Sequence, residues 1–170
     1  MRYDIRPVKA DQWRSLKELR LTALSDPAAS LAFLTTYAQA SAYPDERWQE
    51  NARSSELGLG AVTYVGVAPD GSWAGMVTVL LESPDQPKAQ IVGLYVRPEH
   101  RRTGLAEELL LAAVARAMEG PAGAENVFLS VHEQNVRAQR LYEAQGFVRT
   151  GDDDVDDTGQ IWEYARKRLP

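Results

Sequence analysis

A short run in the middle of the chain combines residue types that suit a phosphate site. After the apolar stretch Leu94-Tyr95-Val96, two arginines arrive and Gly104 precedes a helical pattern. A glycine there lets a ligand approach the backbone closely, and the first amides of a helix attract anions. Guanidinium groups suit phosphate oxygens. The run Arg101-Arg102-Thr103-Gly104-Leu105-Ala106 therefore predicts a phosphate or pyrophosphate cradle, with a capped turn and solvated arginines as the alternative. It lacks the patterns of a Walker or a Rossmann loop.

A second run further along carries polar groups at the start of another helix. Asn135 suits the N-cap of a helix that carries Tyr142 on its apolar face and ends at Gly146. Tyr142 can be a packing residue or a proton donor. His132, just before this helix, is either an exposed strand residue or a base.

The two runs together resemble the GCN5-related N-acetyltransferase (GNAT) family. Arg101-x-x-Gly104-x-Ala106 is similar to the family's pyrophosphate loop, and Leu94-Tyr95-Val96 is similar to its fourth strand. The segment 129–147 resembles the family's fifth strand and the helix after it. The close likeness covers roughly residues 89–148.

The resemblance implies a role for each matching residue. The strand run Leu94-Tyr95-Val96 would bind the acetyl-pantetheine arm of acetyl-CoA through the main chain of Leu94 and Val96. Amides from Arg101 to Ala106 would hold the pyrophosphate, and Asn135 would contact the cofactor nearby. Tyr142 would point its hydroxyl at the cofactor sulfur and protonate the departing thiolate. The implied activity is direct acetyl transfer from acetyl-CoA to a primary amine, without a metal.

The sequence also departs from the family at two positions where some members carry a carboxylate. Gln90 and Ser130 stand there, and neither side chain takes up a proton at neutral pH. A lysine-like amine with a pKa near 10.4 is about one part in a thousand deprotonated at pH 7. A water held by Ser130, backbone carbonyls, Glu82 or His132 could take the proton, so the base stays unassigned.

The surrounding pattern predicts one α/β domain over 1–170, with a single mixed, mostly antiparallel sheet and helices on both faces. Apolar periodicity and turn signals predict the following elements. Strands are expected over 3–6, 61–67, 73–81, 89–96, 127–131 and 160–168. Helices are expected over 12–24, 45–55, 105–118 and 136–145, with Asp11 capping the first helix and Gly58 ending the second.

Composition excludes several classes of protein. The chain has 170 residues, no cysteine, two histidines and a net charge of −5, so thiol chemistry, a thiolate or histidine metal site and a generally basic nucleic-acid binder are not expected. No apolar run suggests a signal peptide or membrane span. We expect a cytoplasmic protein and allow for a homodimer. Five of the six residues over 152–157 are Asp, which predicts either a solvated loop or an acidic lip that attracts a cationic acceptor.

Three other functions remain open at this point. The chain could be an acyl-CoA-binding sensor without turnover, or an interaction domain whose acidic loop binds a basic partner. It could also transfer a longer acyl group. The acceptor is equally open among arylamines, aminoglycosides, polyamines, amino acids and protein N-termini.

Overall fold

The computed structural model describes residues 2–33, 35–81, 88–119 and 123–169 and contains an eight-stranded sheet. The strand order is β1-β2-β3-β4-β5-β8-β6, and β7 pairs with β8. The strands are β1 (Asp4–Pro7), β2 (Ala61–Val67), β3 (Trp73–Leu81), β4 (Lys88–Val96), β5 (Asn126–His132), β6 (Val148–Arg149), β7 (Asp154–Asp156) and β8 (Gly159–Lys167). The helices are α1 (Trp13–Leu24), α2 (Ala29–Ala32), α3 (Tyr37–Ser41), α4 (Asp45–Leu57), α5 (Leu105–Ala117) and α6 (Val136–Ala144).

The sheet is mixed and mostly antiparallel, as predicted. β4 and β5 are parallel, and the other described pairs are antiparallel. Parallel neighbours need a crossover connection, and α5 supplies it. The turn at Pro69-Asp70-Gly71 closes the predicted hairpin between β2 and β3.

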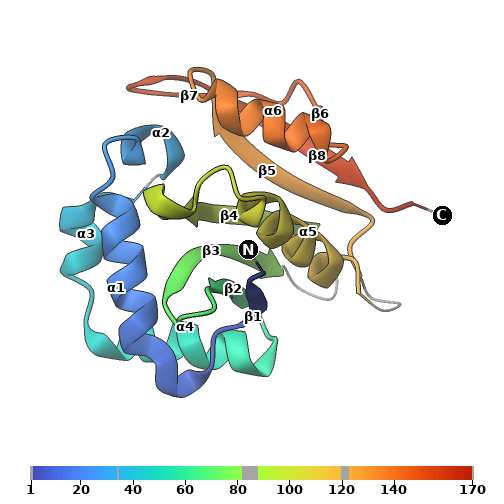
Figure 1. The fold of residues 1–170 in the computed structure, drawn as a ribbon. Helices are drawn as coiled ribbons and strands as arrows, with labels where there is room; N and C mark the ends of the chain where they lie inside the picture. The colour runs from blue at the N-terminus through green and yellow to red at the C-terminus, as the bar shows by residue number, and fades with distance from the viewer. Residues whose placement is uncertain (1, 34, 82–87, 120–122, 170) are drawn as a thin grey trace.

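Helices cover both faces of the sheet, and each face has its own apolar core. On one face α5 and α6 pack against inward residues of the strands. On the other face α1, α3 and α4 pack against Val65, Met76 and Tyr95. Figure 1 shows α1, α3 and α4 grouped together, while α6 lies along β5.

Most predicted elements occur within one or two residues of their expected bounds, but the start of the first helix was predicted wrongly. Asp11 lies in a 3-10 turn over Ala10–Gln12, and α1 begins at Trp13 without a side-chain cap. The short helices α2 and α3 were not predicted because four or five residues carry too little periodicity. Gly146 has a φ of 84°, as expected for a helix end, and Phe147 packs on Tyr142 with ring centroids 6.1 Å apart.

Among the described residues, no helix is long and apolar enough to span a membrane, and no group of His, Asp or Glu side chains is arranged to hold a metal ion. Glu82, a candidate for holding a water, lies outside the described residues.

Substitutions of two neighbouring leucines of α5 test which face of this helix packs against the sheet. Leu110 is 0% exposed and Leu111 is 40% exposed. Leu110→Ala should lower the free energy of unfolding by about 2–5 kcal/mol, because it leaves a cavity between α5 and the sheet. Leu111→Ala is the matched control and should cost less than about 1 kcal/mol. Urea unfolding measures both, and equal losses would contradict this orientation of α5.

Candidate active site

The two central strands β4 and β5 are paired along only part of their length. Their parallel pairing ends at Ile91 and Leu129, although β4 continues to Val96 and β5 to His132. The strands separate toward their C-terminal ends (Figure 1). An opening in the middle of the sheet results, with a strand edge on each side.

An irregularity in β4 occurs where the two strands separate. The register against β3 shifts, so that Thr78 opposes Val92 but Met76 opposes Tyr95. Gly93 lies within this shift and has a φ of 66°, a conformation that glycine adopts without steric cost. Bulges of this kind bend a strand and redirect its side chains.

Beyond the bulge, the backbone of β4 alternates between β3 and the opening. The Arg97 amide donates to the Ala74 carbonyl at 2.8 Å, just past the point where Val96 opposes β3. This geometry turns the amide and carbonyl of Val96 away from β3, and those of Leu94 point the same way. The main chain of Tyr95 faces β3, while its side chain is buried in the core beside α1.

The turn between β4 and α5 has the backbone conformation of an anion cradle. Arg102 has a φ of 63° and Gly104 has a φ of 90°. Left-handed residues in close succession direct neighbouring amides to one side. The first bond of α5 runs from the Glu108 amide to the Gly104 carbonyl, so the amides of Leu105 and Ala106 lack an acceptor within the helix. A Cβ on Gly104 would meet no atom within 4 Å.

Tyr3, just before β1, braces this turn from one side. Its hydroxyl donates to Thr103 Oγ1 at 3.2 Å and lies 3.0 Å from His100 Nδ1. Thr103 Oγ1 in turn donates to the His100 carbonyl at 2.6 Å. The start of the chain therefore fixes the turn that precedes α5.

Arg101 braces the turn from the other side, so its guanidinium is already engaged. Its Nε donates to the Val96 carbonyl at 3.1 Å, and its Nη2 lies 2.5 Å from Asp26 Oδ2 after α1. The Ala28 amide lowers the pKa of the Asp26 carboxyl, and Arg101 lowers it further against the effect of burial. Arg102 is exposed beside the turn.

Tyr142 lies on the inner face of α6 and is 9% exposed. Its hydroxyl forms no hydrogen bond with the described residues. Burial raises the pKa of this phenol to about 12. The group is therefore neutral near pH 7 and is able to donate a proton, but it is a poor base.

The loop between β5 and α6 is held by Gln139, which the sequence analysis missed. Gln139 Nε2 donates to the His132 carbonyl at 3.2 Å and to the Glu133 carbonyl at 2.8 Å. Asn135 Oδ1 accepts the Ala138 amide at 3.3 Å, which is the expected N-cap. The available signal for Gln139 was a polar residue three positions before Tyr142, on the inner face of the predicted helix.

His132 is buried, contrary to the exposed position expected for it. The side chain is 2% exposed, and its Nδ1 accepts the Gln134 amide at 3.1 Å. The neutral ring therefore carries its proton on Nε2, which is buried without a partner in the described chain. In this arrangement His132 presents a donor rather than a free base.

A carboxylate lies across the sheet from Ser130. Ser130 opposes Glu163 of β8 in the antiparallel pair, and directly opposed side chains lie on the same face. Glu163 Oε1 accepts the Thr150 hydroxyl at 2.8 Å. Gln90 lies in the paired part of β4, opposite Phe128 of β5. The pairing of β5 with β8 could not be read from local sequence, which is why Glu163 was missed.

The acidic segment is partly structured. Asp153 forms an ion pair with Arg149. Asp156 Oδ1 accepts the Thr158 amide at 2.7 Å, and the bonds from Thr158 hold the pKa of Asp156 below its ordinary value. The acidic segment 152–157 was expected to be a loop, but it contains the exposed strand β7, and only Asp157 and Thr158 form the turn into β8.

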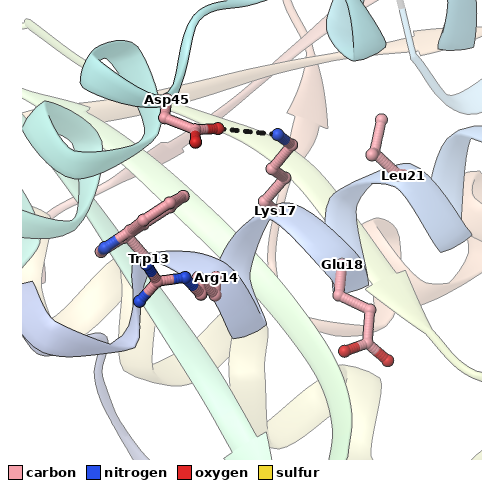
Figure 2. A pocket seen from close by; sticks show the side chains of 6 residues that line it. All are labelled: Trp13, Arg14, Lys17, Glu18, Leu21 and Asp45. Carbon is pink, nitrogen blue, oxygen red and sulfur yellow. Dashed lines mark hydrogen bonds and ion pairs between the residues drawn. The ribbon is translucent and has the colours of Figure 1, made fainter.

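A separate hollow of about 340 Å³ lies beside α1, and Figure 2 shows the side chains that line it. It is lined by Trp13, Arg14, Lys17, Glu18, Leu21 and Asp45. The ion pair between Lys17 Nζ and Asp45 Oδ1, 2.8 Å apart, crosses it and joins α1 to α4. None of the cradle or strand-edge residues lines this hollow, so it is not a candidate for the same ligand.

The order of elements, the opening between β4 and β5 and the cradle before α5 define one class of protein. A model of the acetyltransferase (GNAT) family matches residues 21–147, which is most of the chain. The chain therefore belongs to the acetyltransferase (GNAT) family, and the resemblance seen in the sequence is confirmed.

One curated relative is also an acetyltransferase, but only a short stretch of it matches this chain. A stretch of 68 residues is 41% identical to a mycothiol acetyltransferase of Thermobispora bispora, covering 40% of this chain and 22% of that protein. This chain thus spans about a fifth of the length of that curated relative.

Solved structures share the fold over nearly the whole chain. PaiA N-acetyltransferase from Thermoplasma acidophilum, in complex with coenzyme A, has a TM-score of 0.75 and 22% identity, over 99% of this chain and 100% of its own. The protein yncA from Salmonella typhimurium, with acetyl-CoA, has a TM-score of 0.75 and 16% identity, over 100% and 98%. At these identities the likeness establishes the fold alone.

The buried phenol of Tyr142 predicts a pH dependence of stability. Between about pH 10 and 12 an unfolded tyrosine ionises while buried Tyr142 stays protonated, so the unfolded state is favoured as pH rises. The free energy of unfolding of the wild type should fall relative to Tyr142→Phe by up to about 1.4 kcal/mol per pH unit there. Below pH 9 the difference should be constant. Urea unfolding from pH 7 to 11 measures it, and parallel curves throughout would contradict the raised pKa.

Proposed function

We propose that this chain transfers an acetyl group from acetyl-CoA directly to a primary amine of a small molecule or protein. The observation that carries the proposal is the exposed backbone edge of Leu94 and Val96, continuous with the left-handed turn at Gly104. A strand edge suits an extended amide-containing arm, and a nest before a helix suits a pyrophosphate. The two features are joined by the seven residues 97–103.

In this proposal each group has a distinct task in holding the ligand. Acetyl-CoA supplies the acetyl group as a thioester. The carbonyl of Leu94 and the amide of Val96 bind the pantetheine arm, the Leu94 amide faces the thioester oxygen, and the Val96 carbonyl stays with Arg101. Amides between Arg102 and Ala106, with the Arg102 side chain, bind the pyrophosphate. Asn135 keeps its Nδ2 for the arm, because only its Oδ1 is used by the cap.

The proposed reaction forms one carbon–nitrogen bond and breaks one carbon–sulfur bond. The amine nitrogen attacks the carbonyl carbon, and the Leu94 amide stabilises the negative charge that develops on the oxygen. The sulfur receives the Tyr142 proton and leaves as the thiol of CoA, the amine nitrogen gives its proton to water, and solvent later returns a proton to the phenolate. The dry surroundings that raise the pKa of Tyr142 also raise the pKa of the departing thiol. The thiolate is therefore basic enough to take the proton of the phenol.

Proton removal from the amine has a candidate path on the opposite face of the sheet. Ser130 and Glu163 are cross-strand neighbours beside the opening, and Glu163 is only partly exposed. A water between them is proposed to accept the proton. A cytoplasmic location and a homodimer remain predictions from the sequence.

Gly104→Val tests the cradle. A Cβ on Gly104 would enter the open space above the turn and strain a φ of 90°, so affinity for CoA should fall at least about tenfold. Gly60→Val is the matched control, because Gly60 also has a positive φ of 67° with nothing within 4 Å but lies before β2. Calorimetry with CoA measures both. Equal affinities of the two folded variants would remove the cradle from the proposal.

Tyr142→Phe separates an enzyme from an acyl-CoA sensor. If the phenol protonates the thiolate, kcat should fall by roughly 10²-fold while CoA affinity changes little. Free CoA released with a panel of amines gives the rate, and calorimetry gives the affinity. A chain that binds acetyl-CoA tightly and releases no CoA with any amine would favour the sensor, and wild-type turnover in the Phe variant would make Tyr142 a packing residue.

A further inference from the structure

Arg20 is a half-buried arginine that reaches the bulge of β4 from α1. Its Nη1 lies 3.0 Å from the position that a Cβ on Gly93 would occupy. Because neighbouring Cα atoms are 3.8 Å apart, this nitrogen is within roughly 8 Å of the Leu94 Cα. Glycine at position 93 therefore provides the space that the guanidinium fills, one residue before the proposed acetyl-binding backbone.

The guanidinium has no anionic partner in the described part of the chain. Its carbon stacks over the Phe33 ring, 4.5 Å from the centroid, and none of the described ion pairs includes it. By contrast, the nearby Arg97 and Arg101 each have a carboxylate, Glu18 and Asp26 respectively. Burial lowers the pKa of Arg20, with Tyr43 opposing this effect.

Such an arginine is costly unless something else compensates it. A guanidinium offers five donors in a planar fork that matches an oxyanion. Stacking on one aromatic ring offsets only part of the loss of water around a buried charge. A fork that has no carboxylate partner among the described residues, and that lies beside the opening in the sheet, is therefore explained best by an anion that arrives with a ligand.

The face on which Arg20 lies indicates which ligand. Tyr142 packs in the core between the sheet and α6, whereas Arg20 projects from α1 on the other face. Under the proposed function, the thioester lies in the opening between them and the phenol faces the sulfur. The amine then approaches from the face that carries Arg20.

We infer that Arg20 binds a carboxylate or phosphate group of the acceptor, so that the preferred substrates are amines carrying an oxyanion a few bonds from the nitrogen. This inference rests on the proposed function and narrows its acceptor class. Polyamines, which carry only positive charge, should be poor acceptors. Such an acceptor carries a positive amine, which the acidic segment 152–157 would attract, and an oxyanion, which Arg20 would bind.

Matched acceptor pairs test the inference. The panel contains an α-amino acid with its carboxamide, phosphoethanolamine with ethanolamine, and spermidine. In the wild type, kcat/KM should be at least about tenfold higher for one oxyanion member than for its neutral partner. The first pair reports a carboxylate and the second a phosphate. Arg20→Gln should abolish that preference and Arg20→Lys should restore part of it, while Arg14→Gln, on the exposed side of α1, should keep it in full.

A second measurement does not depend on turnover. Melting temperatures of the wild type and Arg20→Gln are compared with each panel member, with and without CoA. A bound oxyanion should raise Tm in the wild type only. If neither the rates nor the Tm shifts distinguish anionic from neutral members, or if Arg20→Gln changes both classes equally, the inference is wrong. If calorimetry shows that the wild type does not bind CoA, the proposed function is wrong instead.

Discussion

The separation of β4 from β5 is the constraint on which the rest of the site depends. Inside a sheet every backbone amide and carbonyl needs a partner, yet past Ile91 and Leu129 these two strands no longer supply one to each other. β5 remains held by β8 on its other edge, and β4 remains held by β3 through the bulge at Gly93. The opening can therefore persist without unravelling either strand, and its unpaired groups are available to a ligand.

The cradle before α5 is preorganised by contacts from distant parts of the chain. A non-glycine residue with positive φ, such as Arg102, is uncommon and costs free energy. Tyr3 holds the turn from β1, and Arg101 ties it to β4 and to Asp26 after α1. These braces compensate the backbone strain locally. The guanidinium of Arg101, predicted to contact the phosphate, is engaged by the Val96 carbonyl and Asp26, and its role toward the cofactor stays a prediction.

Sequence patterns predicted the features that depend on interactions between residues close together in the chain. The helix of Leu105 to Ala117, the N-cap at Asn135 and the left-handed end at Gly146 depend on neighbours within a few residues, and these predictions were confirmed. The ion pair between Arg101 and Asp26 and the pairing of Ser130 with Glu163 join segments 75 and 33 residues apart in the chain. Such contacts follow from topology and strand register, which a one-residue shift would change.

Unsatisfied polar groups identify a site only where they converge. Trp48 Nε1 and Arg166 Nη1 are buried without a partner in the described chain, yet no cradle or open strand edge accompanies them. His132 Nε2 lies at the end of β5, the Tyr142 hydroxyl lies under α6, and the Arg20 guanidinium lies at the β4 bulge. The Arg20 guanidinium lies beside the bulge near which β4 leaves β5, while Tyr142 is buried in the core on the opposite face of the sheet. Under the proposed function, Tyr142 and Arg20 would face the two substrates from opposite faces of the sheet, which is the arrangement that a direct transfer between them needs.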